Sequence, residues 1–155
     1  MKYKDLTNEE LEALEPEFVK YLAANTITAD DWIQIKKHEP TKTSEMISHF
    51  SELVLDNILN NIKYLQFNTK EKVMVFHCDE EAITSIIMEA PAEINPDFTN
   101  KEYFKKVVGN PPAGIKVYSA EKKYSKERNI ELFEMTEKGC FPTDENLFEA
   151  LEKAL

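Results

Sequence analysis

The sequence is poor in the residues from which several classes of protein site are built. Only three Gly occur among 155 residues, and the chain has no Gly-x-Gly-x-x-Gly, P-loop or Gly-x-Ser-x-Gly motif. Only two Cys occur, without a zinc-type pairing; they could form one disulfide, but they fit a reducing cytoplasm better than a disulfide scaffold. These absences argue against an enzyme without excluding one. We assign no catalytic residue and expect no metal and no cofactor.

Long apolar runs and an excess of basic charge are also missing. No window approaches 18 consecutive apolar residues, and the charged start of the chain is followed by no apolar run, so we expect neither a membrane span nor an export signal. The net charge is −10, with −6 up to residue 62 and −4 after it. Because affinity for nucleic acids depends on neutralising phosphates, we expect no nucleic-acid partner.

What remains is the composition of an ordinary folded protein. Hydrophobic residues make up 42% and charged residues 31% of the chain, and 155 residues are enough to bury a core without disulfides. We therefore predict a single globular domain over residues 1–155. Cys78 and Cys140 are expected to be free thiols, which fits a reducing cytoplasm.

The clearest pattern in the chain is a helix predicted over residues 43–65. Apolar residues recur there at steps of three and four and so lie along one side of a helix: Met46, Ile47, Phe50, Leu53, Val54, Ile58, Ile62 and Leu65. Leu55 and Leu59 widen the apolar arc, so we expect this to be a central core helix covered by two layers.

The first 40 residues are predicted to be short helices. Thr7 with Glu10 and Thr28 with Asp31 both have the spacing of a capping box, which marks a helix start. Pro16 is expected to break the first helix and open a second one, which carries Phe18, Val19, Tyr21 and Leu22 inward. Trp32 follows the second capping box.

The pattern then changes to that of β-strands. Residues 72–78 and 82–88 are expected to form a hairpin, with residues 64–68 as a preceding strand and residues 115–118 as an edge strand. A capping box at Thr99 and Glu102, and later helices over residues 125–138 and after Thr143, complete the pattern. The predicted fold is α+β: a small antiparallel sheet of about three to four strands, covered by the central helix and the terminal helices.

Four polar or aromatic positions stand out as candidates for binding besides Trp32 and His77: Asn57, Asn61, Tyr124 and Arg128. Asn57 and Asn61 lie one turn apart within the apolar arc of the central helix, where buried amides need hydrogen-bond partners; they are expected to fix a loop or strand end or, as the alternative, to line a pocket. Tyr124 and Arg128 belong to a small basic strip with Lys122, Lys123 and Lys126; the strip is expected either to bind phosphate-bearing ligands or to form a solvated face.

Several short stretches resemble an uncharacterised family of small acidic bacterial proteins, of the kind associated with the Bacteroidetes. They are residues 1–3, 6–7, 27–32, 63–65, 75–77, 123–125 and 129–130. The family is a domain of unknown function, so the resemblance assigns no catalytic residue. It implies a bacterial cytoplasmic protein.

Three kinds of function remain open. The first is a cytoplasmic, non-enzymatic interaction or adaptor protein that binds another protein, with Trp32 and Tyr124 as anchors. The second is a small-molecule-binding protein or enzyme with a pocket between the sheet and the central helix, near Asn57, Asn61 and His77. The third is a homo-oligomer that pairs through the edge strand at residues 115–118.

Overall fold

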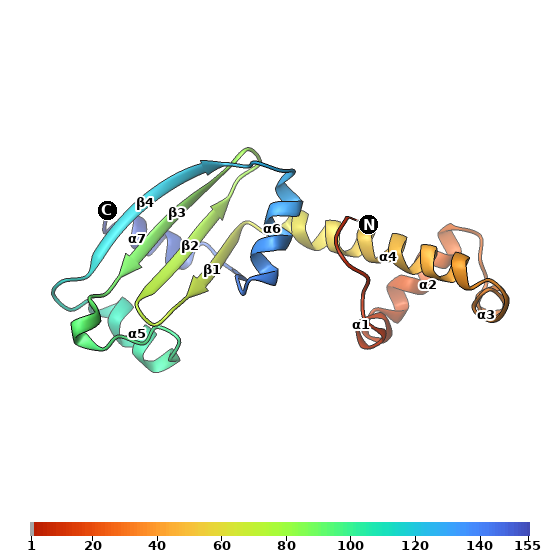
Figure 1. The fold of residues 1–155 in the computed structure, drawn as a ribbon, viewed down its shortest axis with the longest axis horizontal. Helices are drawn as coiled ribbons and strands as arrows, with labels where there is room; N and C mark the ends of the chain where they lie inside the picture. Colours follow the sequence, from red (N-terminus) through yellow and green to blue (C-terminus); the bar gives the residue numbers. More distant parts are fainter. Residues whose placement is uncertain (1) are drawn as a thin grey trace. The chain divides into compact units, whose positions relative to one another are not determined.

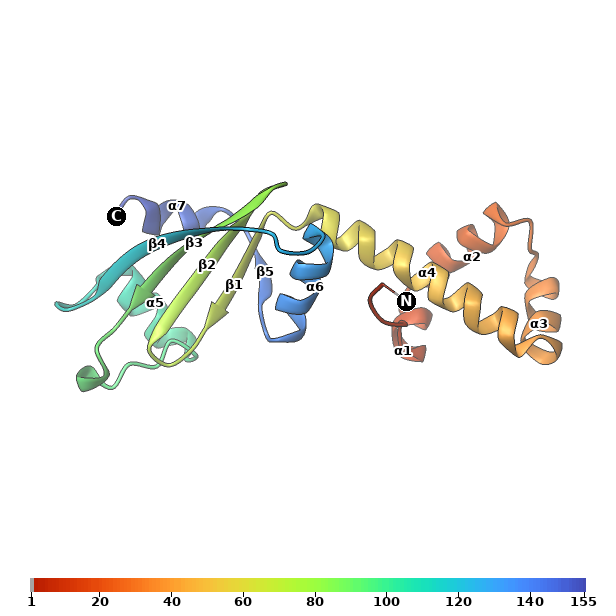
Figure 2. The ribbon, with the colours of Figure 1, turned by 45° about the horizontal axis from the view of Figure 1, so that its top comes forward.

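The structure is a computed structural model that describes residues 2–155 (Figure 1; Figure 2). In chain order its elements are α1 (Asn8–Ala13), α2 (Glu15–Ala24), α3 (Ala29–His38), α4 (Pro40–Asn61), β1 (Tyr64–Asn68), β2 (Lys72–Cys78), β3 (Ala82–Glu89), the 3-10 helix η1 (Ala92–Ile94), α5 (Lys101–Gly109), β4 (Lys116–Lys123), α6 (Arg128–Glu137), β5 (Phe141–Thr143) and α7 (Asn146–Glu152). The α+β class is confirmed.

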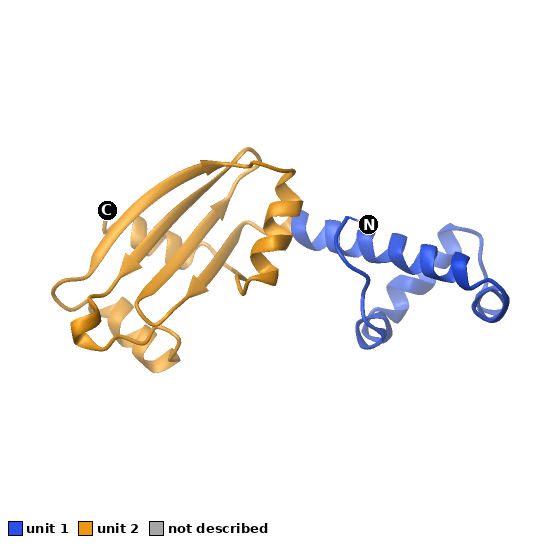
Figure 3. Ribbon diagram, in the orientation of Figure 1, with its two compact units in different colours: residues 1–60 blue, residues 61–155 orange. Residues whose placement is uncertain are grey.

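The chain groups into two compact units, Met1–Asn60 and Asn61–Leu155 (Figure 3). We call the first the helical unit and the second the sheet unit. Each has its own buried residues. The single domain over residues 1–155 stays a prediction.

Two capping boxes begin helices of the helical unit, as the sequence predicts. The Thr7 hydroxyl accepts from the amide of Glu10, and the Glu10 carboxylate accepts from the amide of Thr7. Thr28 and Asp31 form the same pair of bonds at the start of α3. These hydrogen bonds hold the pKa of both carboxyls below the ordinary value. Pro16 lies in the first turn of α2, where no intrahelical hydrogen bond is lost.

The helical unit buries few apolar side chains: Leu6, Leu22, Ile35, Phe50 and Leu59. The first residues are fixed to α4 through Ser51, which is fully buried and accepts from the amide of Leu6 at 2.9 Å. The predicted apolar stripe of α4 is only partly buried, since Leu53 and Ile58 are 48% and 50% exposed. No helix within residues 2–155 has both the length and the apolar character needed to cross a membrane.

The sheet unit contains an antiparallel five-stranded sheet in the order β4-β3-β2-β1-β5. The prediction of three to four strands omitted β5, which has three residues, one of them Pro142. β4 runs from Lys116 to Lys123 and is thus longer than the predicted strand at residues 115–118. Both end strands of the sheet pair on one side only within the described residues.

One face of this sheet forms the core of the unit. Val73 and Val75 of β2 lie in register with Met88 and Ile86 of β3, and all four are at most 1% exposed. Their helical neighbours in the core come from α5 and α7: Val107, Phe148 and Leu151. In Figure 1, α7 lies behind the sheet and α5 lies near the lower ends of its strands. The sequence predicted that a terminal helix and the central helix both cover the sheet. The terminal helix α7 does pack on it, whereas no residue of α4 belongs to this core cluster.

The start of α5 differs from its predicted capping box. Asn100, not Thr99, is the N-cap, and its side chain accepts from the amide of Tyr103. The Thr99 hydroxyl instead donates to Asp97. Asn is as good an N-cap as Thr, so the sequence Thr-Asn offered two competing caps one residue apart.

The opposite face of the sheet carries a row of large side chains. Phe67, Met74, Ile87 and Tyr118 are neighbours in register across four strands. The first three are half-buried and Tyr118 is 39% exposed. This face is less completely covered than the core face.

Candidate functional site

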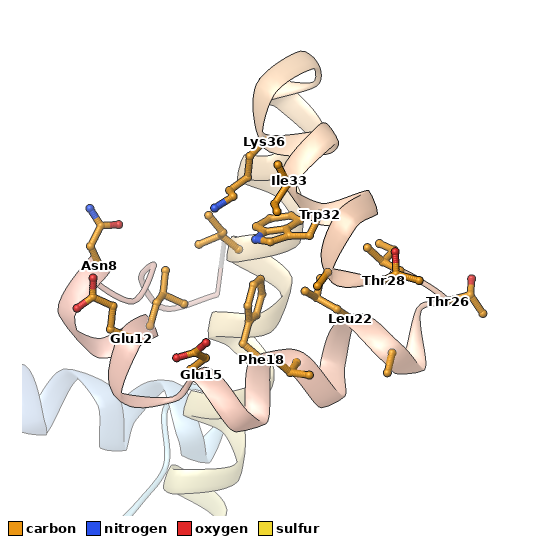
Figure 4. A pocket seen from close by; sticks show the side chains of 16 residues that line it. Asn8, Glu12, Glu15, Phe18, Leu22, Thr26, Thr28, Trp32, Ile33 and Lys36 are labelled. Atoms are coloured by element: carbon orange, nitrogen blue, oxygen red, sulfur yellow. The ribbon is translucent and has the colours of Figure 1, made fainter.

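The helical unit contains an apolar groove with a volume of about 960 Å³. Its walls come from α1, α2, the α2–α3 turn and α3, with Ile47 from α4 (Figure 4). We call it the Trp32 groove. The volume lies at the upper end of the range of ligand pockets, about 300–1,000 Å³.

Aromatic side chains form the floor of the Trp32 groove. The ring of Phe18 packs edge-on against Trp32 at 5.2 Å and against Phe50 at 4.9 Å between ring centroids. Phe50 is buried, whereas Phe18 and Trp32 are half-buried and line the open cavity. Figure 4 shows Phe18 and Trp32 pointing toward each other from α2 and α3. Such edge-to-face pairs fix ring orientation, so the floor is preformed.

The upper walls expose aliphatic side chains to solvent. Val19 of α2 is 55% exposed and Ile33 of α3 is 44% exposed. The expectation that Val19 points inward with Phe18 is therefore wrong. Phe18 packs against Trp32 of α3 and Phe50 of α4, whereas Val19 lies on the side of α2 that faces the open groove.

Charged side chains flank this apolar surface. Glu12 of α1 and Glu15 of α2 line the groove, and Lys36 of α3 lines it from the other wall (Figure 4). The Lys36 amine lies 5.9 Å from the centroid of the Trp32 ring, within the range of a cation–π contact. Among the ion pairs of residues 2–155, none includes Glu12 or Glu15.

The turn between α2 and α3 sets the two main walls and contains a strained residue. The amide of Ile27 donates to the carbonyl of Leu22, and that of Thr26 to Ala23, which is the Schellman pattern of a helix end. The residue at the left-handed position is Thr26, with φ +59°. α6 ends with the same two bonds, and there the position is taken by Gly139.

Replacement of Thr26 by glycine is expected to stabilise the protein. A β-branched residue in the left-handed region costs about 1–2 kcal/mol, and the greater freedom of Gly in the unfolded chain offsets about half of that gain. We expect a net gain of about 0.5–1 kcal/mol and a Tm higher by roughly 2–3 °C, measured by calorimetry.

The matched control is Gly139→Thr, which should destabilise the protein by more than Thr26→Gly stabilises it. Its Cβ would lie 3.1 Å from the ring of Phe67 in addition to the strain at φ +110°. A Tm of Thr26→Gly equal to or below that of the wild type would contradict the strain at this turn.

Of the residues singled out in the sequence, Trp32 lies in the groove. Asn57 and Asn61 are exposed on α4 and line neither the Trp32 groove nor the second described cavity, of about 620 Å³, which lies on the Tyr21 side of the α2–α3 turn. Their predicted burial in the apolar arc is therefore wrong. Sequence analysis missed Glu12, Glu15 and Lys36 as charges of a site, because only the packing of three short helices brings them together.

His77 lies in an aromatic cluster of the sheet unit. Its ring stacks on Tyr64 of β1 at 4.8 Å between centroids and packs against Phe148 of α7 at 5.5 Å. It lines neither of the two described cavities. This environment makes the imidazole part of the packing between sheet and helix.

Arg128 and Tyr124 both bind backbone carbonyls. The Arg128 guanidinium donates to the carbonyls of Ile62 at 2.6 Å, Cys78 at 3.1 Å and Asp79 at 3.1 Å. The Tyr124 hydroxyl donates to the carbonyl of Asp79 at 2.7 Å, and burial raises the pKa of Tyr124 to about 12. The two side chains thus fix the ends of β2 and β4 to the start of α6.

The lysines of the predicted basic strip pair with acids of α6. Lys122 donates to Glu131 at 3.0 Å and Lys126 to Glu134 at 2.6 Å. Burial by itself would raise the pKa of the Glu131 carboxyl, but hydrogen bonds from Lys122 and Ser125 outweigh burial and lower it. The strip is therefore largely engaged within the sheet unit.

The thiols and acids show no activated nucleophile or metal centre in the described part of the chain. Cys78 and Cys140 are free; burial raises the pKa of Cys78 to about 11 and also raises that of Cys140. A reactive thiol needs the opposite shift. Cys140 directly precedes the strand β5, not a helix. Across residues 2–155 no three His, Cys, Asp or Glu side chains gather in a metal-binding arrangement.

Fold and groove together define an α+β protein with a helical unit that carries an apolar groove and a sheet unit built on a five-stranded antiparallel sheet. The chain belongs to DUF6495, a family of unknown function, whose model matches residues 1–155. The resemblance to an uncharacterised family is thereby confirmed. Neither the curated proteins nor the solved structures contain a match to the chain.

Proposed function

We propose that the protein is a non-enzymatic interaction protein that binds a segment of another protein in the Trp32 groove. The observation that carries this proposal is the solvent exposure of apolar side chains around a half-buried Trp: Val19 and Ile33 line the same groove as Trp32 and are 55% and 44% exposed. Contiguous exposed apolar surface with a polar rim is typical of binding sites.

The residue types of the groove support this proposal. Trp is among the residues that most often dominate the energy of a protein interface, especially within a pocket surrounded by smaller apolar contacts. Trp32 has such a setting, with Phe18 beside it and Ile33 on the wall. Tyr124, the second predicted anchor, is half-buried and bonded to Asp79, so we place the binding site on Trp32 alone.

Affinity capture with the full-length chain as bait tests the proposal. We expect Ile33→Glu to lose a partner that the wild type captures from its host, because a carboxylate would be desolvated in the occupied groove. The matched control is Ile94→Glu, at an exposed Ile of the sheet unit that is 42% exposed. A partner retained by Ile33→Glu, or lost equally in both variants, would contradict the groove as the binding site.

A small apolar ligand is the second candidate occupant. The groove volume of about 960 Å³ favours it, because drug-sized molecules bind in pockets of this size. This differs from the pocket near Asn57, Asn61 and His77 that the sequence suggested. Ligand screening by thermal shift, repeated on Ile33→Glu, separates the two occupants, since a small molecule would raise the Tm without any captured protein.

Self-association through the edge strand remains a weaker proposal. β4 offers a free edge within the described chain, but it carries Lys116, Glu121, Lys122 and Lys123. Charged side chains on an edge strand oppose pairing with a copy.

We further propose a cytoplasmic location, which the two free thiols support.

A further inference from the structure

We propose that the occupant of the Trp32 groove is a basic amphipathic α-helix of a partner protein. This inference rests on the proposed function and adds the secondary structure and the charge of the partner. Three observations carry it: the walls are helical, two carboxylates that form no ion pair within residues 2–155 flank an apolar floor, and Lys36, a cation that lines the groove, lies over the Trp32 ring.

The walls decide the secondary structure of the occupant. Between Lys2 and Asn60 every regular element is a helix, and a helix satisfies its backbone N–H and C=O groups internally. The groove therefore offers no strand edge to which an extended segment could add. An extended occupant would bury unpaired amides against Phe18, Leu22 and Trp32, which is costly. A helix pairs its amides internally except in its first turn, so its middle presents only side chains to the groove.

The apolar surface of the Trp32 groove determines which face of the bound helix packs into it. Apolar residues of the floor and the upper walls line both sides of the groove: Leu11 of α1 with Phe18 and Val19 of α2 on one side, and Trp32 and Ile33 of α3 on the other. A surface of this kind receives a row of apolar side chains spaced at three and four residues. The occupant must be polar on its other face, because the groove is open to solvent.

The charges decide the sign of the occupant's polar residues. Glu12 and Glu15 line the groove and form no ion pair within residues 2–155. Lys36, the cation of the groove, lies over the Trp32 ring. The 60 residues of the helical unit carry six basic and twelve acidic side chains. Lys or Arg next to the apolar face of the bound helix would lie close to the carboxylates of Glu12 and Glu15. Electrostatic attraction between the basic helix and the acidic helical unit would also increase the association rate.

Three synthetic peptides test the inference on the full-length protein. The first is an 18-residue peptide of Leu and Lys whose leucines lie on one helical face. The second has Glu in place of every Lys, and the third has the Leu–Lys composition with two central prolines that prevent a helix. Trp32 is the only Trp of the chain, so its fluorescence reports binding in the groove and not on the apolar row of the sheet unit.

The Leu–Lys helix is expected to shift the emission of Trp32 to shorter wavelength with a saturable curve. The Leu–Glu and proline peptides should bind at least roughly ten-fold more weakly. Ile33→Glu should lower the affinity for the Leu–Lys helix by roughly 30-fold or more, as expected when a hot-spot residue is replaced. Ile94→Glu should bind like the wild type.

A pair of charge variants separates a specific contact from general attraction to an acidic chain. Glu12→Gln/Glu15→Gln and Glu80→Gln/Glu81→Gln have the same net charge of −8, two less negative than the −10 of the wild type. Glu80 and Glu81 are exposed in the β2–β3 turn. We expect the first variant to bind the Leu–Lys helix roughly three- to ten-fold more weakly and the second to bind nearly as the wild type does.

Four results would overturn the inference. Equal binding of the proline peptide would show an extended occupant, and equal binding of the Leu–Glu peptide would show that the carboxylates do not select charge; both would leave the groove as a binding site. Equal losses in the two charge variants would show non-specific attraction. A response of Trp32 to none of the peptides would also overturn it, while the proposed function is decided separately by capture with Ile33→Glu.

Discussion

Arg128→Ala is expected to destabilise the sheet unit by about 3 kcal/mol. The guanidinium donates to three backbone carbonyls, those of Ile62, Cys78 and Asp79. Charged hydrogen bonds contribute about 1.5–3 kcal/mol, and the carbonyls left without this donor add a desolvation cost. Ile62 and Cys78 are buried residues, so water does not replace the guanidinium easily. Urea unfolding followed by circular dichroism measures the loss.

The control for Arg128 is Lys126→Ala, which breaks an ion pair of α6 on the surface. Lys126 and Glu134 are 55% and 42% exposed, and exposed pairs contribute about 0–1 kcal/mol. Arg128→Lys should recover only part of the stability, because a single ammonium cannot reach three carbonyls in different directions. An Arg128→Ala protein as stable as Lys126→Ala would show that Arg128 is not a structural residue.

Trp32→Ala is expected to reduce binding in the groove by roughly 30-fold or more, which corresponds to the loss of at least about 2 kcal/mol at a hot spot. The indole forms the floor together with Phe18 and carries Lys36 over its ring. Its removal opens the floor on the α3 side. The variant has no Trp, so calorimetric titration with the Leu–Lys helix or the captured partner measures the affinity.

Tyr124→Phe is the control for this second prediction, since Tyr124 is the other anchor that the sequence suggested. It keeps the ring and removes only the hydroxyl that donates to Asp79. We expect unchanged affinity and a loss of stability of about 1 kcal/mol. If Tyr124→Phe lowered the affinity and Trp32→Ala did not, the binding site would lie on the sheet unit.

Local signals in the sequence predicted the elements that need no distant partner. Thr7 with Glu10 and Thr28 with Asp31 fix helix starts within four residues, and Pro16 ends one helix and opens the next. The three strands of the meander β1, β2 and β3 were also predicted, since their turns are short and their alternation is strong. β5 was not, because its three residues form a strand only by pairing with β1 far along the chain.

In the candidate site, too, the sequence indicated some residues, whereas others became apparent only in the structure. Trp32 was singled out as an aromatic residue of the kind that is frequent at protein interfaces, but the sequence could not tell whether it lay in the core or in a groove. Val19 has the same spacing as a buried residue and is 55% exposed, because α1, α2 and α3 are too short to cover one another fully. In the sequence, Glu12 and Glu15 look like ordinary surface acids. Only the packing of α1 and α2 places them beside an apolar floor.

By itself, the sequence determined the class of the fold, the starts of α1 and α3, the strands β1 to β3, part of β4 and the acidic charge, because capping, turn chemistry and alternation act between neighbours along the chain. The tertiary structure decided the division into two units, the fifth strand, the role of Arg128 and the Trp32 groove. Each of these depends on which surfaces of distant segments meet, and that is set by packing and not by the local pattern of residues.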